Sequence, residues 1–330
     1  MNAPSKPAIR TPPRSTFRGL FIDGDWSVTE RSEPVIDPAT EDTVVPAPWG
    51  SIAEAEAAVA AARRAFDEGP WPKMSPGERA AALARLRDVL AAWADDAVGL
   101  VVAEAGIPIT IARASQFDLP MQLLDFFIER CTQFEPLRPL PVTTFPSRHG
   151  GTVLGAGVVQ RSPRGVVTAI TPFNAPFFVN LLKVGPALAA GCTVVLKPSE
   201  FTPLSALLLG AAAQEADLPP GVLNVVTGGA EVGEFLTTDP RIDMVTFTGS
   251  DAVGTKVMTQ ASATLKHVVL ELGGKSAMIV RADADMDLVA PRAAQELTLF
   301  TGQGCGLWTR HLVHRSRYDE YLDRVSGILE

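Results

Sequence analysis

The sequence has few of the residues that build disulfide frameworks or metal centres. Its 330 residues include three cysteines and four histidines. Cys131, Cys192 and Cys305 are too few for a disulfide framework, and they are typical of a protein in a reducing cytosol. The histidines, which are His149, His267, His311 and His314, fall in no metal-ligand spacing. We therefore predict neither a disulfide scaffold nor a metal site.

Excess positive charge and long apolar runs are also missing. The net charge is −8, so no overall basic surface is expected to recruit nucleic acid. No apolar run approaches the length of a membrane span. Residues 1–17 contain proline, serine and basic residues without the apolar stretch of a secretory signal, and they predict a disordered lead-in. We expect a cytoplasmic protein that binds neither nucleic acid nor a membrane.

The first 135 residues are predicted to be mainly helical. Capping boxes at 51–54 and 75–78 each predict the start of a helix, and leucines after the second recur at steps of three and four. An Asp-Gly turn at 23–24 predicts a small hairpin before these helices. Residues 136–164 differ, because proline, threonine, glycine and valine dominate there. This composition predicts an excursion of two strands.

From Gly165 onward, apolar strand-like runs alternate with helical segments. The runs begin near Val166, Thr193, Val222 and Met244, and 267–272 forms a fifth. Continuous apolar strands at βαβ spacing are typical of a parallel sheet that is covered on both faces. The predicted fold class is therefore α/β, with a Rossmann-like parallel sheet and flanking helices.

Two motifs near the end of the chain carry reactive groups. Glu271 opens the sequence Glu-Leu-Gly-Gly-Lys-Ser, and Cys305 closes the sequence Phe-Thr-Gly-Gln-Gly-Cys. A strand and a helix between them can return the chain to its starting level, so thiol and carboxylate can meet in space. A thiol that attacks a carbonyl and a base that activates water form a covalent mechanism in outline.

These motifs, together with Asn174, Lys197 and Gly249–Ser250, resemble the NAD(P)-dependent aldehyde dehydrogenase superfamily. The resemblance covers nearly the whole chain from Phe21. It implies an NAD-binding domain in two pieces, an oligomerisation hairpin and an incomplete catalytic domain that bears the thiol. The implied boundaries are 18–135 and 165–270 for the NAD-binding domain, 136–164 for the hairpin and 271–330 for the catalytic domain.

The resemblance implies roles for four residues in the oxidation of an aldehyde to a carboxylic acid. Cys305 would form a thiohemiacetal and then a thioester, and Glu271 would be the general base that activates water. A carboxylate serves this role best when partial burial raises its pKa. Asn174 would donate its amide to the developing oxyanion, and Lys183 is a candidate for proton relay or site electrostatics. Phe300 departs from the family, which commonly has Asn at that place.

The cofactor residues combine a local signal with the resemblance. Gly249–Gly254 ends a strand and opens a helix, which suits either a phosphate-binding loop or a plain helix cap. A carboxylate at Glu200 would accept hydrogen bonds from ribose hydroxyls and repel a 2′-phosphate, which favours NAD over NADP, although Lys197 could partly offset the repulsion. NADP remains possible. The full cofactor set is Thr171, Pro172, Phe173, Lys197, Ser199, Glu200, Gly228, Gly233, Phe247, Thr248, Gly249, Ser250, Leu272 and Gly273.

The sequence ends at Glu330, earlier than the family pattern does. The family's downstream Glu-x-Phe-Gly-Pro segment and its final strand for assembly would follow this point. We therefore expect an incomplete aldehyde dehydrogenase with a small-molecule aldehyde as substrate. Two alternatives remain open. One is a non-catalytic fragment or a subunit that binds a partner through the 136–164 hairpin. The other is a CoA-acylating enzyme, against which Glu271 argues.

Overall fold

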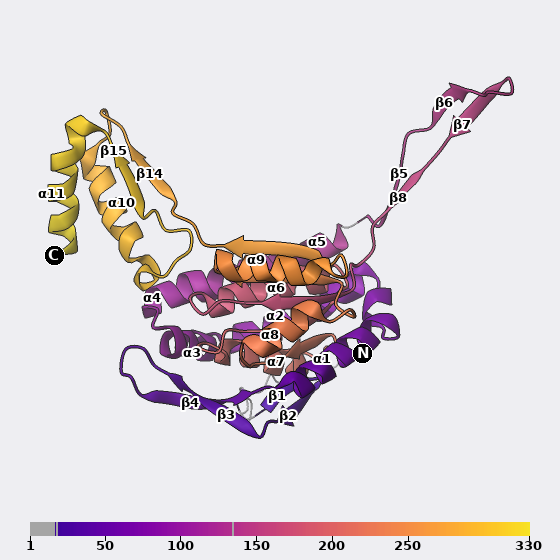
Figure 1. The fold of residues 1–330 in the computed structure, drawn as a ribbon, viewed down its shortest axis with the longest axis horizontal. Helices are drawn as coiled ribbons and strands as arrows, with labels where there is room; N and C mark the ends of the chain where they lie inside the picture. The colour runs from indigo at the N-terminus through magenta and orange to yellow at the C-terminus, as the bar shows by residue number, and fades with distance from the viewer. Residues whose placement is uncertain (1–16, 18, 134) are drawn as a thin grey trace, which may run out of the picture.

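A computed structural model describes residues 17, 19–133 and 135–330 of the chain. The segment 1–17, predicted to be disordered, lies outside the described residues apart from Phe17. The described chain forms a large body with two projections (Figure 1). One projection is a long thin arm, and the other is the C-terminal segment beyond the last strand of the central sheet.

The body is built on a seven-stranded sheet with the order β13-β12-β9-β10-β11-β1-β2. Strands β13 to β11 in that order are all parallel, and β1 and β2 add to the β11 edge in antiparallel orientation. The predicted α/β class and all five predicted parallel strands are confirmed. The strands are β1 (Gly19–Ile22), β2 (Asp25–Val28), β9 (Val166–Ile170), β10 (Thr193–Lys197), β11 (Leu223–Val225), β12 (Met244–Gly249) and β13 (His267–Leu272).

Helices cover both faces of this sheet because successive side chains of each strand point to opposite sides. In β10, Val194 and Leu196 pack in one core cluster and Val195 packs in another. The first face carries α2 (Pro76–Ala92), α3 (Ala94–Ala105), α5 (Leu119–Thr132), α6 (Pro176–Ala189) and α7 (Leu204–Glu215), and the second carries α1 (Ile52–Asp67), α8 (Ala230–Thr238) and α9 (Asp251–Ser262).

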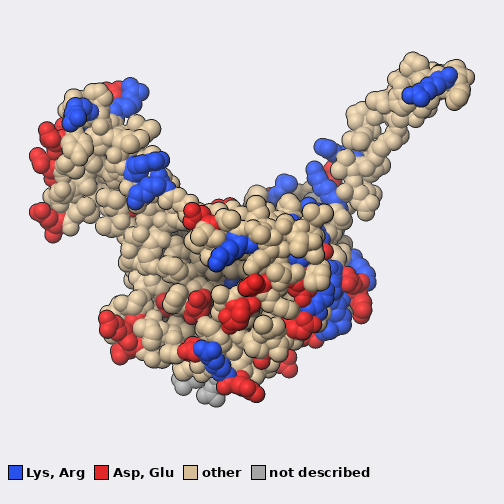
Figure 2. Space-filling view, in the orientation of Figure 1, with Lys and Arg blue, Asp and Glu red and all other residues tan. Residues whose placement is uncertain are grey.

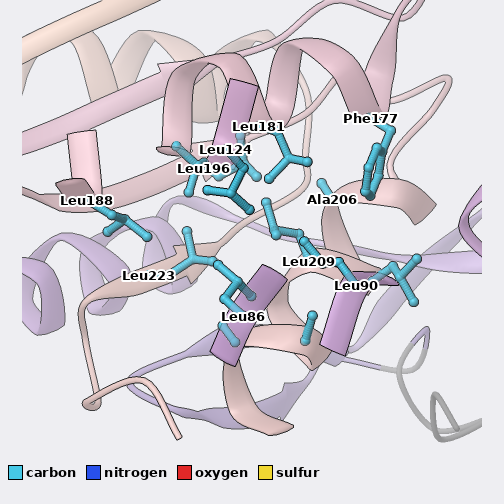
Figure 3. Packing of buried hydrophobic residues seen from close by; sticks show 14 of the residues in the cluster. Leu86, Leu90, Leu124, Phe177, Leu181, Leu188, Leu196, Ala206, Leu209 and Leu223 are labelled. Atoms are coloured by element: carbon cyan, nitrogen blue, oxygen red, sulfur yellow. The ribbon is translucent and has the colours of Figure 1, made fainter. Parts of the chain in front are cut away.

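The first face holds the larger apolar core. Figure 3 shows leucines of α2, α5 and α6 converging on Leu196 of β10 and Leu223 of β11. Leu196 has no exposed surface, and Leu223 is 2% exposed. Both predicted capping boxes are present, with Ser51 starting α1 and Ser75 starting α2. Short segments η2 (Trp71–Lys73), α4 (Ile109–Ile111) and η3 (Ala112–Asp118) join the longer helices.

A second hairpin in the first part of the chain was not predicted. It consists of β3 (Arg31–Ile36) and β4 (Thr43–Trp49), which pair in antiparallel orientation. Proline stands opposite proline in this ladder, at Pro34 and Pro46. Proline is tolerated mainly on edge strands, so a segment that contains proline is not normally predicted to be a strand. The prolines are therefore the reason that the sequence did not predict this hairpin.

The arm contains more strand segments than the two that the sequence predicts. It has four, in two successive antiparallel pairs: β5 (Leu137–Pro139) with β8 (Val158–Gln160), and β6 (Thr143–Pro146) with β7 (Thr152–Gly155). Prolines and glycines between the pairs break the ladder. The arm extends away from the body (Figure 1), and it carries basic side chains at its tip and at its base, with mostly uncharged surface between them (Figure 2).

The C-terminal projection is a half-covered pair of strands. β14 (Ala277–Val280) and β15 (Arg310–Val313) pair in parallel orientation. Two helices, α10 (Met286–Thr298) and α11 (Tyr318–Leu329), pack on them through a small cluster around Tyr321. The short turns η4 (Leu299–Gly302) and η5 (Arg315–Arg317) complete the segment. Cys305 lies between α10 and β15, so this projection supplies the thiol.

Candidate active site

A single cleft at the carboxyl ends of the parallel strands collects most of the predicted site residues. Its volume is about 680 Å³, within the range of small-molecule and cofactor sites. Open α/β sheets bind ligands at this edge because the loops after the strands converge there. The predicted residues that line it are Thr171, Pro172, Phe173, Asn174, Lys197, Ser199, Glu200, Gly233, Phe247, Thr248, Gly249, Ser250, Glu271, Leu272, Gly273 and Cys305.

The cleft brings the predicted thiol, carboxylate and amide together. Cys305 comes from the C-terminal projection, Glu271 from the end of β13, and Asn174 from the turn between β9 and α6. Asn174 Nδ2 donates a hydrogen bond to the carbonyl of Gln303, at 2.6 Å. This bond fastens the turn after β9 to the loop that carries the thiol. An amide nitrogen has two N–H donors, so the second remains for another acceptor.

The backbone before Cys305 is strained. Phe300 and Thr301 have φ angles of 52° and 53°, and Gly302 follows with a φ of 76°. A left-handed conformation is costly for bulky and β-branched residues, and such outliers gather at functional sites. The strain falls where the sequence departs from the family pattern at Phe300. The thiol of Cys305 itself is exposed, whereas Cys131 and Cys192 are buried.

Glu271 sits on the outermost strand of the sheet. Its Cα is paired with that of Thr248 in the β12–β13 ladder, so Glu271 lies level with the end of β12 and the loop that follows it. The side chain of Glu271 is exposed. The partial burial that sequence reasoning sought for a general base is therefore absent in the described chain, because β13 is an edge strand with alternating exposure.

Lys183 lies beneath the cleft and does not line it. It is 6% exposed, and its Nζ donates to Thr246 Oγ1 at 2.8 Å. Burial lowers the pKa of Lys183 to about 8, and the negative charge of Glu271 works against this shift. Because the charge of Glu271 acts on the buried amine of Lys183, the two groups are electrostatically linked although Lys183 does not line the cleft.

The end of β10 contributes one buried cation and one exposed carboxylate. Lys197 is 5% exposed, and burial lowers its pKa, while Glu200 and Glu231 act in the opposite direction. Its ammonium donates to the carbonyl of Pro198 at 3.3 Å. A Cβ on Gly233 would lie 3.8 Å from the Lys197 side chain, so α8 passes directly beside it.

Helix α9 begins at the cleft with an ordered cap. Ser250 is the N-cap, and its side chain accepts a hydrogen bond from the backbone N–H of Val253. The remaining N–H groups of the first turn and the positive end of the helix dipole suit a phosphate group. A Cβ on Gly249 would lie 2.5 Å from the Phe247 ring, so a larger residue there would require that ring to shift.

Gly228 does not line the cleft. It has a φ of 127°, and a Cβ there would lie 2.7 Å from the carbonyl oxygen of Gly50. Glycine at this position is therefore explained by a close approach of two backbones. A cofactor role for Gly228 stays a prediction.

Sequence reasoning missed two helical faces that form the far wall of the cleft. On α9 the lining residues recur at steps of three and four, and α8 opposite shows a similar pattern. Thr237 and Gln260 join the two helices by a side-chain hydrogen bond of 2.6 Å. The helical period was visible in the sequence, but nothing in it showed which face points into the cleft. The missed residues are Gly229, Ala230, Glu234 and Thr237 at α8, Val253, Lys256, Val257 and Gln260 on α9, and Ile170 and Phe201 outside these helices.

Two negative findings apply to the described part of the chain. Among those residues, no group of three or more His, Cys, Asp or Glu side chains is placed to hold a metal ion. Within the same residues, no helix combines the length and apolarity needed to cross a membrane.

Comparisons with known proteins agree with the motifs. The model of the aldehyde dehydrogenase family matches residues 26–329. A chloroplastic betaine aldehyde dehydrogenase of Beta vulgaris is 39% identical over 319 residues, covering 93% of this chain and 61% of the relative. A 3-succinoylsemialdehyde-pyridine dehydrogenase of a Pseudomonas species is 39% identical over 307 residues, covering 92% of this chain and 61% of the relative. The chain thus spans about 61% of the length of these relatives.

Solved structures match over a similar share. A mutant of aldehyde dehydrogenase C from Pseudomonas syringae, in complex with NAD+ and octanal, has a TM-score of 0.88 and 36% identity, covering 97% of this chain and 63% of its own. A Mycobacterium tuberculosis aldehyde dehydrogenase in complex with NAD+ has a TM-score of 0.85 and 42% identity, covering 94% of this chain and 63% of its own. On its motifs, its fold and its match to the family model, this chain belongs to the aldehyde dehydrogenase family.

Proposed function

We propose that the chain carries the thiol and nucleotide-binding machinery for NAD-dependent oxidation of an aldehyde to a carboxylic acid, through a covalent intermediate on Cys305. One observation carries the proposal: Cys305, Glu271 and Asn174 line the same cleft as the start of α9. Membership of the aldehyde dehydrogenase family supports it independently.

The reaction begins with the exposed thiol. The thiolate of Cys305 adds to the aldehyde carbon and forms a tetrahedral thiohemiacetal with a negative oxygen. The carbon then loses its hydrogen as hydride, and the adduct becomes a thioester on the same sulfur. A bound nicotinamide would supply the acceptor for that hydride.

Glu271 resolves the thioester. Its carboxylate takes a proton from a water molecule, the resulting hydroxide adds to the thioester carbon, and the carbon–sulfur bond breaks. The products are the carboxylic acid and the free Cys305 thiol. The exposed position of Glu271 in the cleft gives water direct access to the carboxylate.

Asn174 stabilises the oxygen that becomes negative. One N–H of its amide holds the carbonyl of Gln303, and the other is available to the oxyanion. A preorganised donor of this kind typically contributes about 3–4 kcal/mol to transition-state stabilisation. Lys183 acts on the same site at a distance, because its buried amine interacts with the charge of Glu271.

The residues of the cleft fit a dinucleotide. The start of α9 at Ser250 suits the pyrophosphate, Glu200 suits ribose hydroxyls, and Gly273 leaves open space in the cleft. Small residues on α8, Ala230 and Gly233, leave room for a flat base between α8 and α9. The NAD+ complexes of the Pseudomonas syringae and Mycobacterium tuberculosis enzymes support NAD as the cofactor.

We extend the proposal to the domain plan and to association. Residues 18–135 and 165–270 would hold the cofactor, and 271–330 would contribute the thiol. The arm at 136–164 would pair copies of the chain, because it exposes apolar side chains far from the body, including Leu154 at 71% and Val142 at 66%. The three cysteines are unpaired, which supports the expected reducing, cytoplasmic setting.

An absorbance assay tests the main proposal. NADH formation from NAD+ and octanal is expected for the chain, and Cys305→Ser should abolish it. Cys192→Ser is the matched control, because that thiol is buried and outside the cleft. No NADH from any short or medium-chain aldehyde would favour the non-catalytic alternative. Acyl-CoA instead of free acid, when CoA is added, would favour the acylating alternative.

A further inference from the structure

The two lysines that line the cleft differ in their exposure and in the charges around them. The cleft is lined by two lysines, Lys197 and Lys256, and by three glutamates, Glu200, Glu234 and Glu271. Lys197 is buried and is flanked by the charges of Glu200 and Glu231. Lys256 is exposed, and within the described chain its ammonium forms no ion pair. Lys256 is therefore the available cation of the cleft wall.

The position of Lys256 on α9 separates it from the pyrophosphate. It lies five residues after Asp251, the first residue of the helix, which corresponds to about 8 Å along the axis. Backbone N–H groups for a pyrophosphate are confined to the first turn. Because Lys256 lies beyond that turn and beside Val253 and Val257, we assign a ligand group that meets it to the adenosine half of a dinucleotide.

The surroundings of Lys256 identify which adenosine group that is. Val253 and Val257, on the same face of α9, offer apolar contact for the base, opposite the small residues of α8. The ribose must then lie between this slot and the end of β10, where Glu200 stands. Lys256 borders the slot and carries a long flexible side chain, so its ammonium can reach the 2′ position.

We propose that Lys256 recognises a 2′-phosphate, so that the cleft accepts NADP as well as NAD. This inference rests on the proposed cofactor role of the cleft. Glu200 repels a 2′-phosphate and accepts hydrogen bonds from a 2′-hydroxyl, and Lys256 attracts the phosphate from the opposite wall. The two side chains set the preference between the cofactors by opposing charges.

Titration calorimetry with 5′-AMP and 2′,5′-ADP tests this without any need for turnover. For the wild-type chain, both nucleotides should bind. Lys256→Met should lower the affinity for 2′,5′-ADP relative to that for 5′-AMP about tenfold, and Lys256→Arg should restore the ratio. Glu200→Gln should shift the ratio in the opposite direction. Lys275→Met is the matched control, because Lys275 is exposed but does not line the cleft.

The outcomes distinguish a failure of the role proposed for Lys256 from a failure of the cofactor assignment of the cleft. Equal losses for both nucleotides in Lys256→Met, or binding of 5′-AMP with no binding of 2′,5′-ADP to the wild type, would overturn the role of Lys256 and leave the cofactor cleft in place. Failure of both nucleotides to bind would overturn the cofactor assignment itself, and this inference with it. A tenfold ratio change that disappears at high salt would support a direct charge contact.

Discussion

The body and the C-terminal projection both contribute to the cleft, but they are built very differently. Strands β9 and β10 of the body are buried on both faces between layers of helices. Strands β14 and β15 of the projection form a two-stranded parallel sheet, and Ile279 and Leu312 on them are 72% and 51% exposed. The residues that we propose bind the cofactor thus follow strands that are buried on both faces, whereas the thiol belongs to a segment with a partly exposed two-stranded sheet.

Because the body and the projection differ in this way, we expect nucleotide binding and catalytic turnover to respond differently to changes in the projection. Parallel sheets are normally covered on both faces, and a two-stranded parallel sheet is marginal by itself. The hydrogen bond from Asn174 to Gln303 is one of the contacts that fix the thiol relative to the body. Nucleotide binding should therefore tolerate changes in the projection, whereas turnover should depend on how well the two parts are joined.

The largest expected effect is a loss of stability when a strand side chain is truncated to alanine in the body, with little loss for the same change in the projection. Leu196→Ala empties part of a fully buried position and should reduce the free energy of unfolding by about 2–5 kcal/mol. Ile279→Ala on the exposed strand should cost less than about 0.5 kcal/mol. Urea unfolding monitored by circular dichroism measures both. Similar losses for the two variants would break the comparison.

Asn174→Ala should affect turnover next most strongly. It removes the proposed oxyanion donor and the bond to the thiol loop, and kcat should fall about 10²–10³-fold. The affinity for NAD+, measured by calorimetry, should change far less, because the cofactor residues of the body remain. An unchanged kcat with weakened NAD+ binding would show that Asn174 belongs to the cofactor site instead.

A buried carboxyl in the body should make stability depend on pH. The carboxylate of Glu104 on α3 accepts hydrogen bonds from the backbone N–H groups of Leu204 and Ser205, at 2.7 and 3.1 Å, and so caps α7. Burial raises its pKa to about 7. A raised folded-state pKa gives stability that is present below the unfolded value and is lost as pH rises towards 7.

The corresponding test compares two chains at two pH values. The stability of the wild type relative to Glu104→Gln should fall by roughly 3 kcal/mol between pH 4.5 and pH 8, since each pKa unit is worth about 1.4 kcal/mol. Urea midpoints at both pH values give the difference. A difference that stays constant, or that grows with pH, would contradict the assigned pKa direction.

The smallest predicted effect concerns the cap at the cleft. Ser250→Ala removes the acceptor for the N–H of Val253 and should cost about 1 kcal/mol of stability. The matched control is Thr259→Ala on the same helix, whose hydroxyl donates to the carbonyl of Thr255 and caps nothing. Thermal unfolding should show a clear loss for the first variant only. Equal shifts would mean that the cap of α9 has no special role.

Most of the fold could be predicted from the sequence because strong periodic signals agreed with each other. The capping boxes at Ser51 and Ser75 and the apolar runs from Val166 to Leu272 gave the helices and strands of the body. The β3–β4 hairpin escaped because its prolines oppose a strand reading. The arm was underestimated because glycines and prolines divide it into short pairs.

The sequence could predict a residue of the cleft only where that residue belongs to a recognisable motif. Cys305, Glu271 and Asn174 belong to motifs, and all three line the cleft. Lys256 belongs to no motif, and which helical face meets the cleft depends on the packing of α8 against α9. The burial of Lys183 beneath Thr246 also depends on tertiary packing, so the sequence could not separate it from the residues that line the cleft.

The central claim is that the sulfur of Cys305 becomes acylated as the cofactor is reduced. The most direct measurement uses Glu271→Gln, in which the thioester should persist because the base that activates water is gone. After mixing with NAD+ and octanal, mass spectrometry should find the peptide that contains Cys305 acylated in an amount equal to the NADH formed. NADH without acylation of Cys305, or acylation of another residue, would contradict the account.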